Sequence, residues 1–291
     1  MVGARRFLGT IGTGPVASGS VTDELDASAD SGALFVPDGD GLMPTEWARG
    51  PWSADSLHGG PVAALVVGEV ESLTPDDGLQ LSRLTLELIR PVPLVRLQVR
   101  STLVRPGRRV QLVDTVVEAD GVEVAWCRAL RIRVPVDRPP AVPTVAEDPA
   151  PAPPSDGVLL PRDPSGHTAF HNGGMEVRFV EGRFDRLGPA TAWFRLRGPV
   201  VLGSPTSPWQ RVAAAADFGN GVSAELPFAT SLFINPDLTV SVHRPPEGEW
   251  VCLQARTRLG SPVVGASESA LWDTRGRIGR AIQNLVVEVA R

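Results

Sequence analysis

Residues 57–73 read LHGGPVAALVVGEVESL, and this stretch decides how the rest of the chain must be arranged. Pro61 suits the first turn of a helix, because its missing N–H would have no helical partner there. The residues that follow are apolar on nearly every side of such a helix. A helix of this kind needs neighbours on all sides, so we expect the fold to wrap around it.

Segments of alternating apolar and polar residues follow this helix and indicate antiparallel strands. In the first half of the chain they run over 81–90, 94–105, 108–119 and 122–134, with hairpin turns at RPGRR (105–109) and ADG (119–121). In the second half we expect strands at 175–184 and 190–198, a helix at 207–218, and strands at 231–243, 249–259, 263–273 and 277–289.

An internal repeat relates the two halves. The segment LTLELIRP at 84–91 recurs as LTVSVHRP at 238–245, and LQVR at 97–100 recurs as LQAR at 253–256. Ahead of them, VAALVV at 62–67 matches VAAAAD at 212–217. The chain therefore holds two copies of one α+β unit, each a buried helix with a long antiparallel meander.

Composition divides the chain into four segments. Residues 1–33 are rich in Gly, Ser, Ala and Asp, which predicts a loose N-terminal arm. Ten of the 30 residues from Pro135 to Pro164 are proline, so 135–165 is expected to be an extended linker. The two folded copies then span 34–134 and 166–291.

Charge and composition exclude several kinds of protein. The 28 basic and 33 acidic residues give a formal net charge of −5, which argues against nucleic acid as a partner. Every basic residue is Arg, so enzymes that need a Schiff-base or phosphate-binding Lys are excluded. No apolar run is long enough for a membrane span or a signal peptide, and we expect a cytoplasmic protein.

The two cysteines, Cys127 and Cys252, each lie within an apolar alternating run. We interpret both as buried packing residues, because neither has a basic neighbour in sequence that would activate a thiol. The cysteine count and the absence of ligand spacing predict neither a disulfide framework nor a metal site, and no cofactor is expected.

The chain resembles the double-hotdog acyl-CoA thioesterases of the thioesterase II (TesB-like) family. The resemblance covers about residues 34–291 and rests on LHGGPVAA at 57–64, the Arg90-Pro91 strand end, VRPGRRV at 104–110, AADFG at 215–219 and AIQN at 281–284, in this order. It implies two tandem helix-wrapped antiparallel sheets. It also implies hydrolysis of an acyl-CoA to free acid and coenzyme A, by a water that polar residues of the second copy direct.

Carried over residue by residue, the family's aspartate falls on Asp217 and its glutamine on Gln283. The hydroxyl-bearing residue, counted back from the HR pair at 243–244, falls on Asn235, with Thr239 as the alternative. Asn235 is a departure from the Thr or Ser of the family, although an amide can also hold a water by hydrogen bonds. These residues are the predicted catalytic group.

The residues also support this site by themselves. A carboxylate on an apolar helix needs polar partners, because burying it alone costs several kcal/mol. An Asp that faces a solvent gap near the helix end is the alternative for Asp217, and a hydrogen bond to neighbouring backbone is the alternative for Gln283. Arg105, Arg108 and Arg109 could hold coenzyme A phosphates or could simply form a solvated hairpin end.

The two copies differ in complementary ways. The first begins its helix with His58, Gly59 and Gly60, whose free amides suit a developing oxyanion, but it has Val67 where the second has Asp217. We therefore expect one composite site at the interface of the copies. His58 is interpreted as a structural hydrogen-bonding residue rather than a base.

Two function classes remain at this point. The first is an acyl-CoA thioesterase, and the second is an acyl-CoA or acyl-carrier binding protein with weak or no hydrolysis, which the amide of Asn235 would suit. A hotdog hydratase is disfavoured, because no Asp and His pair occurs at the short spacing of such enzymes. The expected partners are an acyl-CoA substrate and further copies of the chain, since double-hotdog relatives commonly pair.

Overall fold

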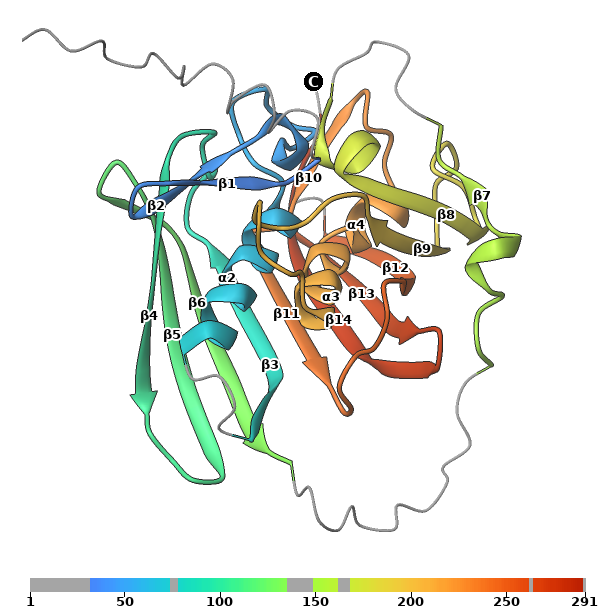
Figure 1. Cartoon of the computed structure of the whole chain (residues 1–291). Helices are drawn as coiled ribbons and strands as arrows, with labels where there is room; N and C mark the ends of the chain where they lie inside the picture. Colours follow the sequence, from blue (N-terminus) through green and yellow to red (C-terminus); the bar gives the residue numbers. More distant parts are fainter. Residues whose placement is uncertain (1–31, 74–77, 135–148, 162–167, 262–263, 290–291) are drawn as a thin grey trace, which may run out of the picture.

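One antiparallel sheet dominates the computed structural model, which describes residues 32–73, 78–134, 149–161, 168–261 and 264–289 (Figure 1). The sheet has 14 strands, in the order β1-β2-β4-β5-β6-β3-β11-β14-β13-β12-β9-β8-β7, and β10 also pairs with β14. The sheet curls around the helices of the two copies, as the apolar helix pattern predicts. The double-hotdog fold class is thereby confirmed.

The first copy consists of one long helix and its meander. Its helix is α2 (Gly59–Leu73), and its meander strands are β3 (Leu79–Leu88), β4 (Leu97–Arg105), β5 (Val110–Ala119) and β6 (Val122–Arg133). The turn between β5 and β6 is formed by Asp120 and Gly121, at φ 50° and 76°. Two successive residues with positive φ match the right-handed twist of the flanking strands.

The second copy repeats this pattern with a shorter helix. Its helices are α3 (Pro208–Ala216) and α4 (Gly219–Val222), and its strands are β8 (Met175–Glu181), β9 (Ala190–Leu196), β10 (Ser231–Ile234), β11 (Asp237–Val242), β12 (Val251–Ser261), β13 (Val264–Asp273) and β14 (Gly276–Val289). Ser207 caps α3, since its hydroxyl accepts a hydrogen bond from the Gln210 N–H at 3.1 Å.

Several short elements are absent from the sequence prediction. They are β1 (Phe35–Asp38), β2 (Gly41–Pro44), η1 (Glu46–Ala48), η2 (Pro154–Asp156), β7 (Val158–Leu159) and η3 (Phe170–Gly174). The part of the expected linker that the structure describes thus includes one helical turn and a two-residue edge strand. Most of the expected arm and the stretch 135–148 lie outside the described residues.

The two copies join where β3 pairs with β11. Thr85 lies opposite Thr239, with Leu84 opposite Val240 and Leu86 opposite Leu238. In the sequence repeat Thr85 corresponds to Thr239, so these two equivalent residues face each other, and on either side Leu84 faces the counterpart of Leu86 and Leu86 the counterpart of Leu84. The two Thr hydroxyl oxygens are 3.5 Å apart. The pair therefore marks an approximate two-fold axis that relates the copies.

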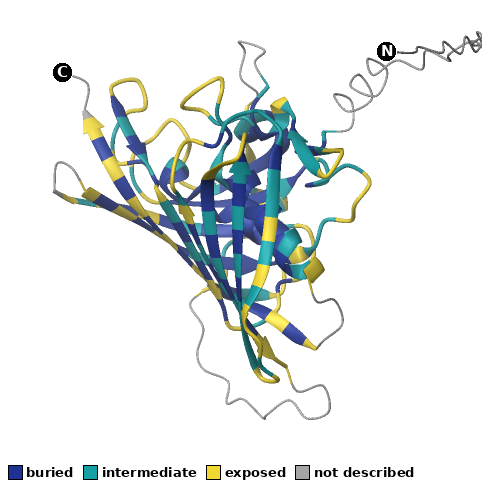
Figure 2. Cartoon of the chain, turned by 90° about the vertical axis from the view of Figure 1, so that its left-hand side faces the viewer, coloured by how far each residue is buried: buried dark blue, intermediate teal, exposed yellow. Residues whose placement is uncertain are grey.

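The helices lie inside the curve of the sheet and pack against each other. A Cβ on Gly60 would lie 2.5 Å from the Ala214 carbonyl oxygen, and one on Gly68 would lie 2.5 Å from the Gln210 amide nitrogen. Small residues on α2 thus let α3 approach closely, in antiparallel direction. Most of α2 is buried, and exposed residues alternate with buried ones along the strands (Figure 2). No helix in the described residues is both long and apolar enough to cross a membrane.

Candidate active site

Asp217 lies at the end of α3, where it is the C-terminal cap, rather than within an unbroken helix as expected. The chain turns there and resumes as α4 at Gly219. Although it stands at a helix end, the Asp217 side chain is only 4% exposed. The solvent-facing alternative is therefore excluded, and the carboxylate needs partners inside the protein.

Asn235 supplies the first partner. Its Nδ2 donates to Asp217 Oδ1 at 2.7 Å and to the Asp237 carbonyl oxygen at 3.0 Å. Both hydrogens of the amide are thereby used, and Asn235 is 8% exposed. The side chain holds the carboxylate by one hydrogen and its own loop by the other.

A bulge brings Asn235 to this position. Between the pairs Ile234–Val286 and Thr239–Ile282, this segment advances 239 − 234 = 5 residues while β14 advances 286 − 282 = 4. The single strand expected over 231–243 is therefore two strands, β10 and β11. Pro236 follows Asn235 in the break, where its lack of an N–H costs no ladder bond.

Gln283 supplies the second partner from the inner face of β14. Its Nε2 donates to Asp217 Oδ1 and to the Asp217 carbonyl oxygen, each at 3.1 Å. Its Oε1 accepts a hydrogen bond from the Asn220 N–H at 3.1 Å. A Cβ on Gly219 would lie 2.8 Å from that Oε1, so the glycine permits the close approach. Gln283 therefore fastens the junction of α3 and α4 as well as the carboxylate.

The first copy contributes His58 and Gly59. His58 Nδ1 lies 2.9 Å from Asp217 Oδ2, and a Cβ on Gly59 would lie 2.7 Å from the same oxygen. Any larger residue at 59 would collide with the carboxylate. The structure thus brings the start of α2 together with the end of α3, at the interface of the two copies.

The Nδ1 of His58 has a second contact, because it lies 3.1 Å from the Gly60 N–H. A ring nitrogen that accepts from Gly60 has no hydrogen for the Asp217 carboxylate. One that donates to Asp217 leaves the Gly60 N–H without an acceptor. Nδ1 can therefore serve only one of these two contacts at a time.

A cavity of about 500 Å³ opens over these groups. Its polar lining includes His58, Asp217 and Asn235, with Gly59 at the helix start. The rest is mainly apolar and includes Trp52, Leu57, Val62, Phe218, Phe228 and Ile234. The cavity can accept an apolar group whose reactive end meets a buried carboxylate.

Two residues of the predicted substrate-binding set lie elsewhere. Gly60 packs against α3 and Phe170 and is not among the cavity-lining residues that the structure describes. Thr239 lies at the joint of the copies, with its hydroxyl 3.5 Å from that of Thr85. Asn235, not Thr239, is therefore the residue that meets Asp217.

The sequence reasoning missed the aromatic wall of the cavity. Trp52 packs on Phe228 at a centroid distance of 5.7 Å and on Phe233 at 5.3 Å. Phe184 also stacks on Phe228, at 5.4 Å. Trp52 and Phe228 line the cavity, whereas Phe233 and Phe184 contact these two without being among its described lining residues. The four residues come from loops and strands of both copies. No sequence pattern links them, because their contacts depend on how the copies join.

The equivalent place in the other half holds no comparable carboxylate cluster among the described residues. Val67 stands there for Asp217, and Gln210 occupies the start of α3. The Gln210 side chain is 6% exposed, accepts from the Ser207 N–H at 2.9 Å and donates to the Ala64 carbonyl oxygen at 3.2 Å. At this second place Gln210 therefore caps α3 and packs against α2.

Neither cysteine belongs to the site. Cys127 and Cys252 are both free and fully buried. Burial raises the pKa of both thiols far above the ordinary value, so neither forms a thiolate readily.

Family models match both halves of the chain. Residues 48–132 match the acyl-CoA thioesterase N-terminal domain, and residues 139–287 match the acyl-CoA thioesterase C-terminal domain. The chain therefore belongs to the acyl-CoA thioesterase family, as the sequence motifs indicate. No curated protein matches its sequence.

Solved structures share the fold at low sequence identity. A hot dog fold protein of unknown function from Alicyclobacillus acidocaldarius is 20% identical, with a TM-score of 0.70 over 91% of this chain and 99% of that one. An acyl-CoA thioesterase II from Mycobacterium marinum is 14% identical, with a TM-score of 0.61 over 90% and 97%. A tesB protein from Mycobacterium avium subsp. paratuberculosis is 14% identical, with a TM-score of 0.60 over 91% of this chain and 99% of that one.

Proposed function

We propose that this protein hydrolyses an acyl-CoA thioester to the free acid and coenzyme A. The observation that carries the proposal is the buried Asp217 carboxylate, held by Asn235 and Gln283 and reached by His58 at the floor of an apolar cavity. A carboxylate held this way, in a space partly shielded from water, suits a general base. The family to which the chain belongs supports the same reaction.

In this mechanism Asp217 Oδ2 accepts a proton from a water molecule, because Oδ1 already has two amide donors. The water oxygen attacks the thioester carbonyl carbon, and negative charge develops on the carbonyl oxygen. When the C=O bond re-forms, the C–S bond breaks and the leaving thiolate takes the proton from Asp217. Atoms and charges balance with water as the only co-reactant.

The start of α2 is proposed to stabilise the carbonyl oxygen. The Gly59 N–H has no hydrogen-bond acceptor within the described part of the chain, and Gly59 lines the cavity. An amide at a helix N-terminus also carries the positive end of the helix dipole.

The direct test is release of free thiol from a panel of acyl-CoA chain lengths, followed with a colorimetric thiol reagent. Hydrolysis of at least one acyl-CoA that depends on Asp217 supports the proposal. No release from any member of the panel contradicts it.

One observation favours an alternative, an acyl-CoA or acyl-carrier binding protein with weak or no hydrolysis. Both hydrogens of the Asn235 amide are used, by Asp217 and by the Asp237 carbonyl oxygen. Asn235 therefore offers a water an acceptor but no donor. Acyl-CoA binding by calorimetry without thiol release would identify this second function.

We also propose that the chain acts in the cytoplasm and as a homo-oligomer. An exposed apolar edge supports the oligomer, since Val158 is 70% exposed and Leu159 47% exposed on the edge strand β7. Light scattering at the mass of a single 30.9 kDa chain would contradict this.

A further inference from the structure

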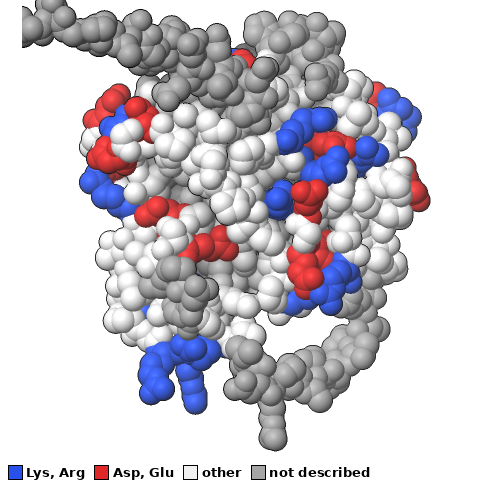
Figure 3. Space-filling model, in the orientation of Figure 1, with Lys and Arg blue, Asp and Glu red and all other residues white. Residues whose placement is uncertain are grey.

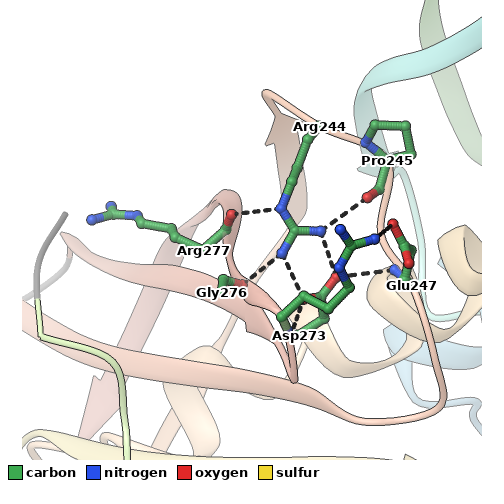
Figure 4. Close-up of polar contacts among 7 residues, drawn as sticks. Arg244, Pro245, Glu247, Asp273, Gly276 and Arg277 are labelled. Carbon is green, nitrogen blue, oxygen red and sulfur yellow. Dashed lines mark hydrogen bonds and ion pairs between the residues drawn. The ribbon is translucent and has the colours of Figure 1, made fainter. Parts of the chain in front are cut away.

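The repeated Arg-Pro pair has different surroundings in the two copies. In the second copy Arg244 is held by Asp273, with Nη1 and Nη2 donating to the two carboxylate oxygens at 2.7 and 2.6 Å (Figure 4). It also donates to the carbonyl oxygens of Pro245, Gly276 and Arg277. This guanidinium is therefore fully engaged in structure.

The surroundings of Asp273 favour its charged form, which pairs with Arg244. Burial alone would raise its pKa, but hydrogen bonds from Arg244 and from the amides of Arg275 and Glu247 hold the pKa below the ordinary value. In the strand pairing Asp273 lies opposite Gly276, and the corresponding pair of the first copy is Ala119 and Val122. The first copy thus has Ala119 where the second has its acid.

Arg90, the counterpart of Arg244, is exposed and makes no side-chain hydrogen bond or ion pair within the described residues. Its backbone also differs. In the second copy the His243 N–H donates to Ile278, whereas in the first copy the Arg90 N–H, one position later, donates to Val124. The corresponding strand pairs Leu88–Ala125 and Val242–Gly279 have the same register, so the two backbones diverge only after the strands end, and this local shift gives Arg90 different surroundings from Arg244.

The freed side chain lies at the site. Arg90 lines the same cavity as His58 and Asp217 and is the one guanidinium among its described lining residues. The chain as a whole carries a formal charge of −5, so a phosphate-bearing ligand needs a local cation. A guanidinium donates two parallel hydrogen bonds to phosphate oxygens.

We propose that Arg90 binds a phosphate of the coenzyme A part of the substrate, which rests on the proposed function. The arginines of the β4–β5 hairpin do not serve this site in the same chain. Arg105, Arg108, Arg109 and Arg133 line a separate cleft at the hairpin end, where Figure 3 shows a basic patch at the lower left of the molecule. In Figure 1 that hairpin lies at the opposite end of α2 from Gly59.

The test compares Arg90→Gln with the unchanged protein on two thioesters of the same acyl group, acyl-CoA and acylpantetheine, which has no phosphate. We expect the KM for acyl-CoA to rise about tenfold with kcat unchanged, the scale of one lost charge-assisted hydrogen bond. The KM for acylpantetheine should not change. An unchanged KM for acyl-CoA, or equal rises for both thioesters, overturns the inference.

Arg280→Gln is the matched control, because Arg280 is exposed on β14, three positions from Gln283 and on the other face of that strand. It should alter neither KM.

If the unchanged protein cleaves neither thioester, the proposed function fails. Calorimetry with free coenzyme A and with pantetheine then tests the role of Arg90. Coenzyme A binding about tenfold weaker in Arg90→Gln supports the inference. Equal affinities, or no binding, overturn it.

Discussion

His58 Nδ1 lies 2.9 Å from Asp217 Oδ2, and this contact joins the first copy of the repeat to the second. The two residues are 217 − 58 = 159 positions apart in the chain. Each comes from the end of a helix inside the curve of the sheet. The contact makes the candidate site a property of both copies, so changes in either copy should affect turnover.

Replacing Asp217 by Asn keeps the volume of the side chain and removes its charge. We expect kcat for any hydrolysed acyl-CoA to fall at least about a hundredfold, the scale for loss of a general base. Stability should change little, because a buried carboxylate is itself costly. Val67→Ala, at the equivalent position of the first copy, should alter packing and leave kcat nearly unchanged. Full activity in Asp217→Asn would exclude this base.

Replacing Asn235 by Ala removes a hydrogen bond to Asp217 Oδ1 and another to the Asp237 carbonyl oxygen. We expect kcat to fall about tenfold, because a loosely held base loses its orientation. Asn235→Thr restores a hydroxyl that can donate to the carboxylate, and it should recover most of the lost rate. The kinetics of the three proteins on one acyl-CoA decide this. If Ala and Thr variants were equally slow, donation to Asp217 would not be the role of Asn235.

Phe228 tests the role of the cavity wall. It is 36% exposed and packs on Trp52, so truncation to Ala removes apolar surface that an acyl chain would cover. We expect the KM for a medium-chain acyl-CoA to rise about fivefold, which corresponds to about 1 kcal/mol of lost apolar burial. The KM for acetyl-CoA should stay unchanged, since its acyl group is too short to reach the wall. Equal changes for both substrates would argue against an acyl-binding wall.

Glu71 gives a prediction about stability. Burial raises its pKa, although a 2.6 Å hydrogen bond from the Ser207 hydroxyl and the charge of Arg131 oppose the rise. A raised pKa means that the folded state holds the proton more tightly, so its contribution is complete below the unfolded value. That contribution is lost as pH rises from the unfolded pKa to the folded one.

Glu71→Gln should therefore be more stable than the unchanged protein at pH 7 and equally stable below about pH 4, where both side chains are neutral. Urea unfolding at the two pH values measures this difference. Glu87→Gln, at an exposed position of β3, serves as the control. A Glu71→Gln midpoint that differs from that of the unchanged protein by the same amount at both pH values would contradict the linkage.

Local pattern and repetition predict most of the fold. The apolar surroundings of α2 follow from its own residues, and the strands of the meander follow from alternation. The ADG turn at 119–121 is readable because Asp and Gly tolerate the φ values it needs. Short elements such as β1 and β7 are not readable, because they are stabilised by pairing with distant residues.

The candidate site is only partly predictable for the same reason. The repeat shows that Asp217 and the glycines at 59 and 60 belong to different copies, and the structure brings Asp217 and Gly59 together. The bulge at Asn235 depends on the register against β14, which sequence alone leaves open. The use of the Gly60 N–H by His58 depends on a side-chain rotamer.

The Thr85–Thr239 pair has a consequence for assembly. Two identical copies meeting through such a joint would form a homodimer, in which the symmetry axis makes every site occur twice. A single chain with both copies has the same architecture at a fixed stoichiometry of one to one. Its copies can therefore diverge independently, so that one place between them keeps a carboxylate while the other is closed by Gln210. A chain with both copies therefore has one such site where a homodimer would have two, and the residues of that one site can change without changing an identical second site.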